Sequence, residues 1–306
     1  MPTAPDTQGV VMDASGRLAA WSIPDAEQRV EIKDCMLYAL SVGFGARPDC
    51  PGHLRFVYEE GLEMVPSMVM TIATPGFWFK DPALGLNWKR LVNVGQSIEI
   101  LRLPKPPFAA ISKSSVIEVV DKGPQKGVLC TWERRLFCAE SFGLLARLTS
   151  TVLLRGDGRA RRSVRQDNVG HVYCPARRPL DGNRITIQTA ASSGLLYRLN
   201  GTLNPLHADP AVARDAGFDR AIMPGTATLG IACAALLEHC CDFRPERLKA
   251  VGARLTAPVY PGELLECHFG RQHEEDTGID FRVVAPERGV IVLEDGHAVL
   301  VRGGCS

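Results

Sequence analysis

The chain has 306 residues, of which 45% are hydrophobic and 23% are charged, and its formal net charge is +1. The length and the apolar content are sufficient for a substantial core and for two domains of ordinary size. The balanced charge gives no indication of nucleic acid as a partner, and no apolar run is as long as a membrane-spanning helix. The N-terminal residues are polar and contain no signal-peptide core, so we expect a cytoplasmic protein without a membrane partner.

The first half of the chain contains one short helical segment. The sequence PSMVMTIATPG at residues 66–76 predicts a helix that Pro75 and Gly76 end early. Space beside such a short helix could admit a ligand. Aromatic side chains follow closely and could pack in the core or line a tunnel; they are Phe77, Trp78, Phe79 and Trp88.

One internal repeat links the two halves. RLFCAESFGLLARLTSTVLLRG (135–156) and RVVAPERGVIVLEDGHAVLVRG (282–303) each contain two strand-like runs around a polar turn, at a constant offset (282 − 135 = 147). This pattern predicts a duplicated unit of about 150 residues, with chance similarity between two hairpins as the alternative. We expect the units to span 1–160 and 185–306, joined by a Gly- and Arg-rich linker at 161–184.

The second half contains the stronger helix. TATLGIACAALLEHC (226–240) is apolar on nearly every side, which is typical of a buried helix. The surrounding strand-like runs alternate between apolar and polar residues, which favours antiparallel pairing. A helix wrapped by an antiparallel sheet in each half is an α+β architecture.

Cysteine and histidine patterns do not predict a metal site. None of the ten cysteines forms a C-x-x-C pair, and residues such as Cys130 and Cys267 lie in apolar contexts. These cysteines are predicted to be buried free thiols. His239, Cys240 and Cys241 are adjacent, but they end a helical run and lack the spacing of zinc ligands.

The stretch YRLNGTLNPLHADP at 197–210 reads as a strand followed by a tight turn at Asn204-Pro205. Asp209 is a suitable N-cap for a short helix over PAVARDA. His207 is therefore expected just ahead of a helix N-terminus. On spacing alone, a structural role in the turn and a catalytic role are both open for this histidine.

Pro224 and Gly225 directly precede the buried helix of the second half. The first amides of a helix have no internal partners and can bind a developing negative charge, such as an oxyanion. A glycine at this position would let a ligand carbonyl approach the backbone closely. These residues and His207 form the candidate site.

The sequence YRLNGTLNPLHADPAVARDAGFDRAIMPG resembles the signature of the MaoC-like, or hydratase 2, family of (R)-specific enoyl-CoA hydratases. The family pattern is Y-R-L-S-G-D-x-N-P-L-H-x-D-P, followed by A-G-F and P-I-L-H-G. The first-half segments DCMLYALSVGFG, LRFVYEE, GQSIEI and VIEVVDKG also have counterparts, so the resemblance covers roughly residues 30 to 303.

The resemblance implies a double hotdog fold, in which two tandem hotdog units each wrap an antiparallel sheet around a helix. The N-terminal unit (1–160) would be degenerate and form the substrate tunnel, and the C-terminal unit (185–306) would carry the motif. The resemblance implies a substrate bound to coenzyme A or an acyl carrier protein, with no bound cofactor. The chain would be a monomer, as a fused pseudo-dimer, or a homodimer.

In the family, an Asp and a His hold one water, which adds to a trans-2-enoyl thioester, while a glycine N–H polarises the thioester carbonyl. The resemblance assigns these roles to His207 and to the N–H of Gly225, and it makes Asn204 a polar residue that orders the site. Residues expected to bind the substrate are Tyr197, Arg198, Pro224 and Thr226.

Two positions depart from the family pattern. Thr202 occupies the position of the catalytic Asp, and Pro224 replaces the His of P-I-L-H-G. A threonine hydroxyl can hold a water but cannot serve as a carboxylate base, and loss of a general base typically costs about 10²- to 10⁴-fold in rate.

Three functions therefore remain open. The first is a hydro-lyase acting on an enoyl or 3-hydroxyacyl thioester with His207 alone as acid and base. The second is a thioester isomerase that shifts a double bond with the same histidine. The third is a catalytically lapsed protein that binds acyl thioesters.

Overall fold

The computed structural model describes residues 13–159, 161–165, 180, 182–270 and 277–301. The first half supplies six strands: β1 (Ala26–Val30), β2 (Leu91–Ile100), β3 (Phe108–Lys122), β4 (Val128–Cys138), β5 (Leu144–Leu154) and β6 (Arg161–Arg165). The second half supplies β7 (Arg184–Gln188), β8 (Leu248–Leu255), β9 (Leu264–Phe269), β10 (Gly278–Ala285) and β11 (Val290–Leu300).

All of these strands belong to one antiparallel sheet with the order β1-β3-β4-β5-β2-β8-β11-β10-β9-β7, and β6 pairs with β3. Strands β2 and β8 join the two halves, with Ile98 opposite Val251. A Cβ atom on Gly252 would lie 2.7 Å from the Cβ of Ser97, so the close contact of these two strands requires glycine there.

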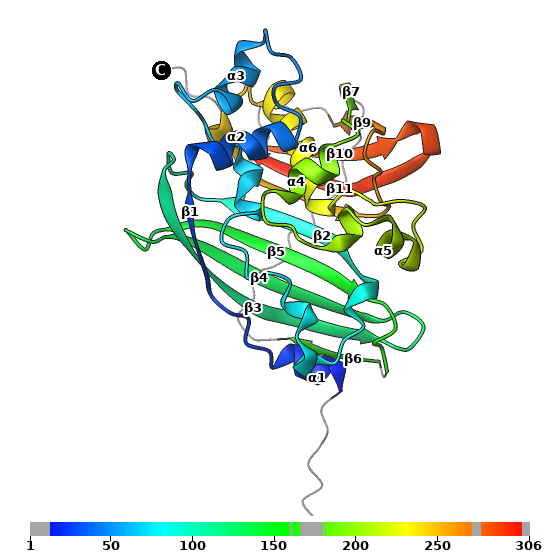
Figure 1. Cartoon of the computed structure of the whole chain (residues 1–306). Coiled ribbons are helices and arrows are strands. Elements are labelled where there is room, and N and C mark those ends of the chain that lie inside the picture. Colours follow the sequence, from blue (N-terminus) through cyan, green and yellow to red (C-terminus); the bar gives the residue numbers. More distant parts are fainter. Residues whose placement is uncertain (1–12, 160, 166–179, 181, 271–276, 302–306) are drawn as a thin grey trace, which may run out of the picture.

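The helices lie on one side of this long curved sheet or at its ends (Figure 1). The α-helices are α1 (Ala14–Ala19), α2 (Ile32–Ser41), α3 (Pro51–Val57), α4 (Ser193–Arg198), α5 (Pro210–Asp215) and α6 (Gly225–Cys240). Short 3-10 helices are η1 (Pro66–Met70), η2 (Trp78–Lys80), η3 (Pro82–Leu84), η4 (Trp88–Arg90), η5 (Pro205–His207), η6 (Pro245–Arg247) and η7 (Pro286–Arg288). No helix within the described residues combines the length and apolar character needed to cross a bilayer.

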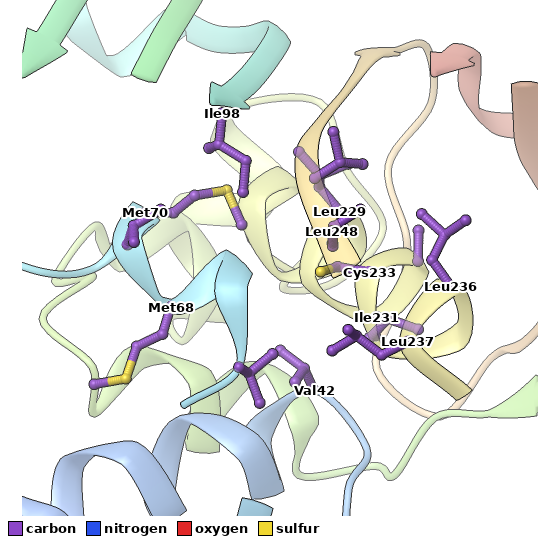
Figure 2. Close-up of a cluster of buried hydrophobic side chains, with 14 of the residues drawn as sticks. Val42, Met68, Met70, Ile98, Leu229, Ile231, Cys233, Leu236, Leu237 and Leu248 are labelled. Atoms are coloured by element: carbon purple, nitrogen blue, oxygen red, sulfur yellow. The ribbon is translucent and has the colours of Figure 1, made fainter. Parts of the chain in front are cut away.

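Helix α6 is the central buried helix that its apolar sequence predicts. Its side chains pack between η1 and the sheet, and Figure 2 shows Leu229, Cys233 and Leu236 of α6 with Met70 of η1 and Ile98 of β2. The expected double hotdog fold is confirmed, because an antiparallel sheet wraps a helical element in each half.

The helical element of the first half is short, as expected. Helix η1 is a 3-10 helix of five residues, whereas α6 has sixteen. Pro66 begins η1, and the chain turns at Gly76 with a φ of +71°. The two halves are therefore unequal in the volume that their helices fill.

The repeated hairpin has the geometry that the sequence predicts. Strand β4 ends at Cys138 and β10 ends at Ala285, again an offset of 147 (285 − 138 = 147). In each half the following strand pairs antiparallel with its predecessor. The first residues of the predicted linker form β6, and most of the remaining linker lies outside the described residues.

The prediction of a strand at the start of the 197–210 stretch is wrong. Tyr197 and Arg198 form the end of helix α4, and residues 199–201 are a turn. The apparent alternation does not separate a buried from an exposed face, because Leu199 and Leu203 are 68% and 75% exposed. The capped helix that follows is confirmed, with the Asp209 side chain accepting hydrogen bonds from the first amides of α5.

Buried free thiols are confirmed for most of the described cysteines. The eight cysteines in this part of the chain are free, and five of them are buried: Cys35, Cys130, Cys233, Cys241 and Cys267. Burial raises the pKa of Cys130 to about 12, so this thiol is protonated and unreactive at neutral pH.

Candidate active site

A cavity of about 450 Å³ lies where the two halves meet. This volume is typical of small-molecule sites. The first half contributes the segment after η1 and parts of β2, β4 and β5, and the second half contributes the loop before α5 and the start of α6. Six of the eight residues expected at the site line it: Thr202, Asn204, His207, Pro224, Gly225 and Thr226.

His207 is held by its backbone turn and by one side-chain hydrogen bond. The side chain of Asn204 accepts a hydrogen bond from the Leu206 amide (3.1 Å), which fixes the 3-10 turn η5. The Nδ1 atom of His207 lies 2.9 Å from the carbonyl oxygen of Ile222. Because a carbonyl can only accept, Nδ1 carries the proton and Nε2 keeps its lone pair.

The protonation state of His207 follows from its environment. The pKa of this imidazole is lowered to about 4, chiefly by burial; the hydrogen bond to Ile222 acts in the opposite direction, and the charge of Arg198 contributes to the lowering. The imidazole is therefore neutral at pH 7 and can accept a proton through Nε2.

The N-terminus of α6 opens onto the same cavity. Within the described residues, the first backbone amides of α6 that donate to another backbone group are those of Ala227 and Thr228, both to the carbonyl of Pro224. The N–H groups of Gly225 and Thr226 precede them and remain as donors at the positive end of a sixteen-residue helix.

Gly225 also leaves room for a neighbouring side chain. A Cβ atom at this position would lie 1.9 Å from Cδ2 of Leu255, which also lines the cavity, so the end of the Leu255 side chain would have to move. We expected a glycine here to allow a ligand carbonyl to approach, and the structure adds that a neighbouring side chain fills the space of a Cβ.

Thr202 lies on the loop after α4, where its amide donates to the carbonyl of Arg198 (3.1 Å). The residue is partly exposed and lines the cavity. The ionisable side chains among the described lining residues are those of Arg134, Arg155 and His207, without an Asp or a Glu. His207 is therefore the lining residue in this part of the chain that can act as a base.

The two other expected substrate-binding residues do not line the cavity. Tyr197 is fully buried, with its ring centroid 5.9 Å from that of Tyr38. Burial raises the pKa of its phenol to about 12. Arg198 is partly exposed and acts on the site through its effect on the pKa of His207.

The aromatic segment after η1 both packs in a core cluster and forms cavity wall. Phe77, Trp78 and Phe79 line the cavity, whereas Trp88 does not. The rings of Trp78 and Phe79 stack with centroids 3.7 Å apart. The space expected beside the short helix is thus present, because the wall also includes Met70 and residues 74–76.

Sequence reasoning missed a polar group on the inner face of the first-half sheet, formed by Gln96, Trp132, Arg134 and Ser150. The signal was available in the strand VLCTWERRLFC. Its even-numbered positions, from Val128 to Leu136, are otherwise apolar and face inward, and Arg134 falls on this face.

Comparisons with known proteins agree with this architecture. Residues 175–292 match the MaoC like domain family, and residues 29–156 match the MFE-2 hydratase 2 N-terminal domain. The peroxisomal enoyl-CoA hydratase 2 of Arabidopsis thaliana is 34% identical over 274 residues, covering 82% of this chain and 85% of the relative. The 3-hydroxyacyl-thioester dehydratase Y of Mycobacterium tuberculosis is 31% identical, covering 89% and 93%.

The fold also matches a solved structure over nearly its full length. A MaoC-like dehydratase from Phytophthora capsici has a TM-score of 0.78 and 25% sequence identity, with 94% of this chain and 99% of that chain covered. The fold, the histidine in the cavity and the relatives together define an enzyme of the hydratase and dehydratase class of lyases. The chain belongs to the MaoC-like, hydratase 2 family.

Proposed function

We propose that this protein is a hydro-lyase that adds water to an enoyl thioester, or removes it from a 3-hydroxyacyl thioester. In this proposal His207 is the acid and base and the Gly225 N–H is the oxyanion donor. The observation that carries the proposal is the hydrogen bond from Nδ1 of His207 to the Ile222 carbonyl, which leaves the lone pair on Nε2 of a residue that lines the cavity. The similarity to an enoyl-CoA hydratase 2 and to a 3-hydroxyacyl-thioester dehydratase supports the thioester substrate.

In the hydration direction, the thioester oxygen accepts a hydrogen bond from Gly225 N–H. Nε2 of His207 takes a proton from a water molecule as the water oxygen forms a bond to Cβ. The electrons of the double bond move to the thioester, and the helix N-terminus stabilises the enolate oxygen. The imidazolium then returns its proton to Cα, so that one water is added and His207 is neutral again.

Thr202 and Asn204 support this cycle without taking a proton. We propose that the Thr202 hydroxyl holds the reacting water by hydrogen bonds. Asn204 acts through the backbone, because its side chain caps the turn that carries His207. Tyr197 and Arg198 have indirect roles in this proposal, in packing and in lowering the pKa of His207.

A thioester double-bond isomerase is the second candidate. Among the described lining residues His207 can act as a base and no carboxylate is present, and one such base also suits a proton shuttle between carbons. The test is to offer a short trans-2-enoyl-CoA and to follow the enoyl absorbance and the product mass. Hydration consumes the absorbance and adds the mass of one water. An isomerase gives a product of unchanged mass, and a binding protein raises the melting temperature without turnover.

We expect kcat/KM to remain high as the pH is lowered through 6.5, the usual imidazole pKa, and to fall only near pH 4. The neutral imidazole is the base, and its pKa is lowered to about 4, so activity is lost on the acid side of that value. The measurement is kcat/KM at pH values from roughly 4 to 8, with circular dichroism at each pH to confirm folding. A half-maximal rate near pH 6.5 would contradict the buried state of this imidazole.

Gly225→Ala should lower kcat/KM by about 10- to 10²-fold, because the added Cβ displaces either Leu255 or the oxyanion amide, and small displacements at an active site have effects of this size. A matched double variant, Gly225→Ala with Leu255→Ala, removes the clash and should recover much of the loss. If the double variant is no better than Gly225→Ala, the contact with Leu255 is not the cause.

A further inference from the structure

Four polar residues of the cavity wall lie together on the inner face of the first-half sheet. Trp132 of β4 is opposite Ser150 of β5, and Ser150 is opposite Gln96 of β2, so the three are neighbours across adjacent strands. Figure 1 shows these strands side by side in the order β4, β5 and β2. Arg134 is two residues further along β4 and therefore shares their face. The Ser150 hydroxyl donates to Oε1 of Gln96 (2.7 Å), so these two side chains are partners of each other.

Arg134 is a buried cation without a buried anion. Its side chain is 4% exposed, and no carboxylate in the described part of the chain forms an ion pair with it. Its Nη atoms donate to the carbonyls of Val69, Met70 and Ile72, at 3.0, 2.8 and 2.9 Å. These bonds satisfy the end of η1, but the Nε–H has no partner.

The charge of Arg134 persists at neutral pH, because burial lowers its pKa only to about 10. A buried charge or donor without a partner is costly unless an acceptor reaches it. The three carbonyls explain why the guanidinium is near η1, and they leave the Nε–H and the net positive charge unmatched.

Trp132 supplies a second unmatched donor. Its indole Nε1–H is buried and has no hydrogen-bond partner, and its ring meets that of Trp78 edge to face, with centroids 6.1 Å apart. Both Trp132 and Arg134 line the cavity. Both donors are already buried in the cavity wall without an acceptor; a ligand that carries an oxygen atom could supply one, whereas a plain alkyl group could not.

Resting on the proposed function, we propose that the substrate's acyl group carries an acceptor oxygen, a carboxylate or a carbonyl, that Arg134 and Trp132 bind. His207 and Gly225 belong to the second half, and Arg134 and Trp132 belong to the first-half sheet. If Gly225 binds the thioester oxygen, the acyl chain of the substrate would extend toward Arg134 and Trp132. The cation that lowers the pKa of His207 is Arg198, which is consistent with a separate role for Arg134.

The test compares pairs of trans-2-enoyl-CoA substrates that differ only in the oxygen. Hexenoyl-, octenoyl- and decenoyl-CoA are each compared with the analogue that ends in a carboxylate and with the analogue that has a keto group near the end of the chain. We expect the oxygenated member of at least one pair to have a kcat/KM at least roughly tenfold higher, as for a hydrogen bond to a charged group. The analogue with the higher kcat/KM then shows whether the donors prefer a carboxylate or a carbonyl.

Three variants link this preference to the donors. Arg134→Met should bring the ratio of the two rates close to one, and Trp132→Phe should reduce it several-fold while keeping the ring. The matched control is Arg147→Met, because Arg147 is an exposed arginine of β5 that pairs with Glu99, and this change should leave the ratio as it is. If Arg134→Met does not fold, since three carbonyls lose their donor, Trp132→Phe and the wild-type pairs decide.

Titration calorimetry with the saturated acyl-CoA pairs separates this inference from the proposed reaction. Equal rates within every pair, with turnover of both members, would overturn the inference and leave the hydro-lyase intact. Tighter binding of an oxygenated analogue without any turnover would support the inference and count against hydration. Neither turnover nor a difference in binding would overturn both.

Discussion

Replacing His207 with Asn should reduce kcat for hydration of an enoyl-CoA by about 10²- to 10⁴-fold, the usual contribution of general acid-base catalysis. The amide nitrogen of asparagine lies near the position of Nδ1 and can still donate a hydrogen bond toward the Ile222 carbonyl, so the turn should keep its shape. It has no lone pair of comparable basicity to take a proton from water. Binding of a saturated acyl-CoA should therefore change little.

The measurement is steady-state kinetics together with calorimetric binding. His239→Asn is the matched control, since His239 is exposed near the opposite end of α6 and should tolerate the same change without loss of rate. Full activity in His207→Asn would show that another group is the base, and the proposed cycle would be wrong.

Thr202→Asp should raise the hydration rate by roughly tenfold to 10²-fold, because a carboxylate would provide a second base, which the described residues of the cavity wall do not supply. A negative charge near His207 should also raise the pKa of the imidazole from its value of about 4. The acid limb of the pH profile should therefore move to higher pH in this variant.

Thr202→Asn is the control for the Asp variant, since it has the same shape and cannot accept a proton. We expect it to stay at or below the wild-type rate. A Thr202→Asp variant that is no faster than wild type would indicate that the site has diverged from its relatives in more than this residue. A gain in isomerised product instead of hydrated product would favour the second candidate function.

The sequence predicted those helices and strands that are determined by residues close together in the chain. The all-round apolar character of 226–240 identified the buried helix, and the Asp209 cap identified the start of α5. The repeated hairpin was visible because both copies kept the same spacing of strand and turn. The strand expected before the turn was wrong, because four residues of alternation are too few to tell a strand from a helix end.

The candidate site was predictable only where one stretch of sequence supplies it. Thr202, Asn204 and His207 lie in one loop, and the resemblance to the family motif predicted all three as site residues. The four polar residues of the cavity wall on the first-half sheet come from three strands. Only the pairing of β2, β4 and β5 brings Gln96 and Arg134 to one face. The protonation of His207 likewise depends on the carbonyl of Ile222, fifteen residues away.

The pairing of β2 with β8, which joins the two halves, affects how the enzyme can evolve by substitution. A pair of identical subunits must repeat every substitution in both copies. Here one continuous sheet joins two halves whose sequences can vary separately. Substitutions in the half with the short η1 can enlarge or reshape its side of the cavity, while the half with α6 keeps the imidazole of His207 and the first amides of the helix in place. Selectivity for the acyl group and the chemistry of the thioester can therefore evolve independently within a single polypeptide.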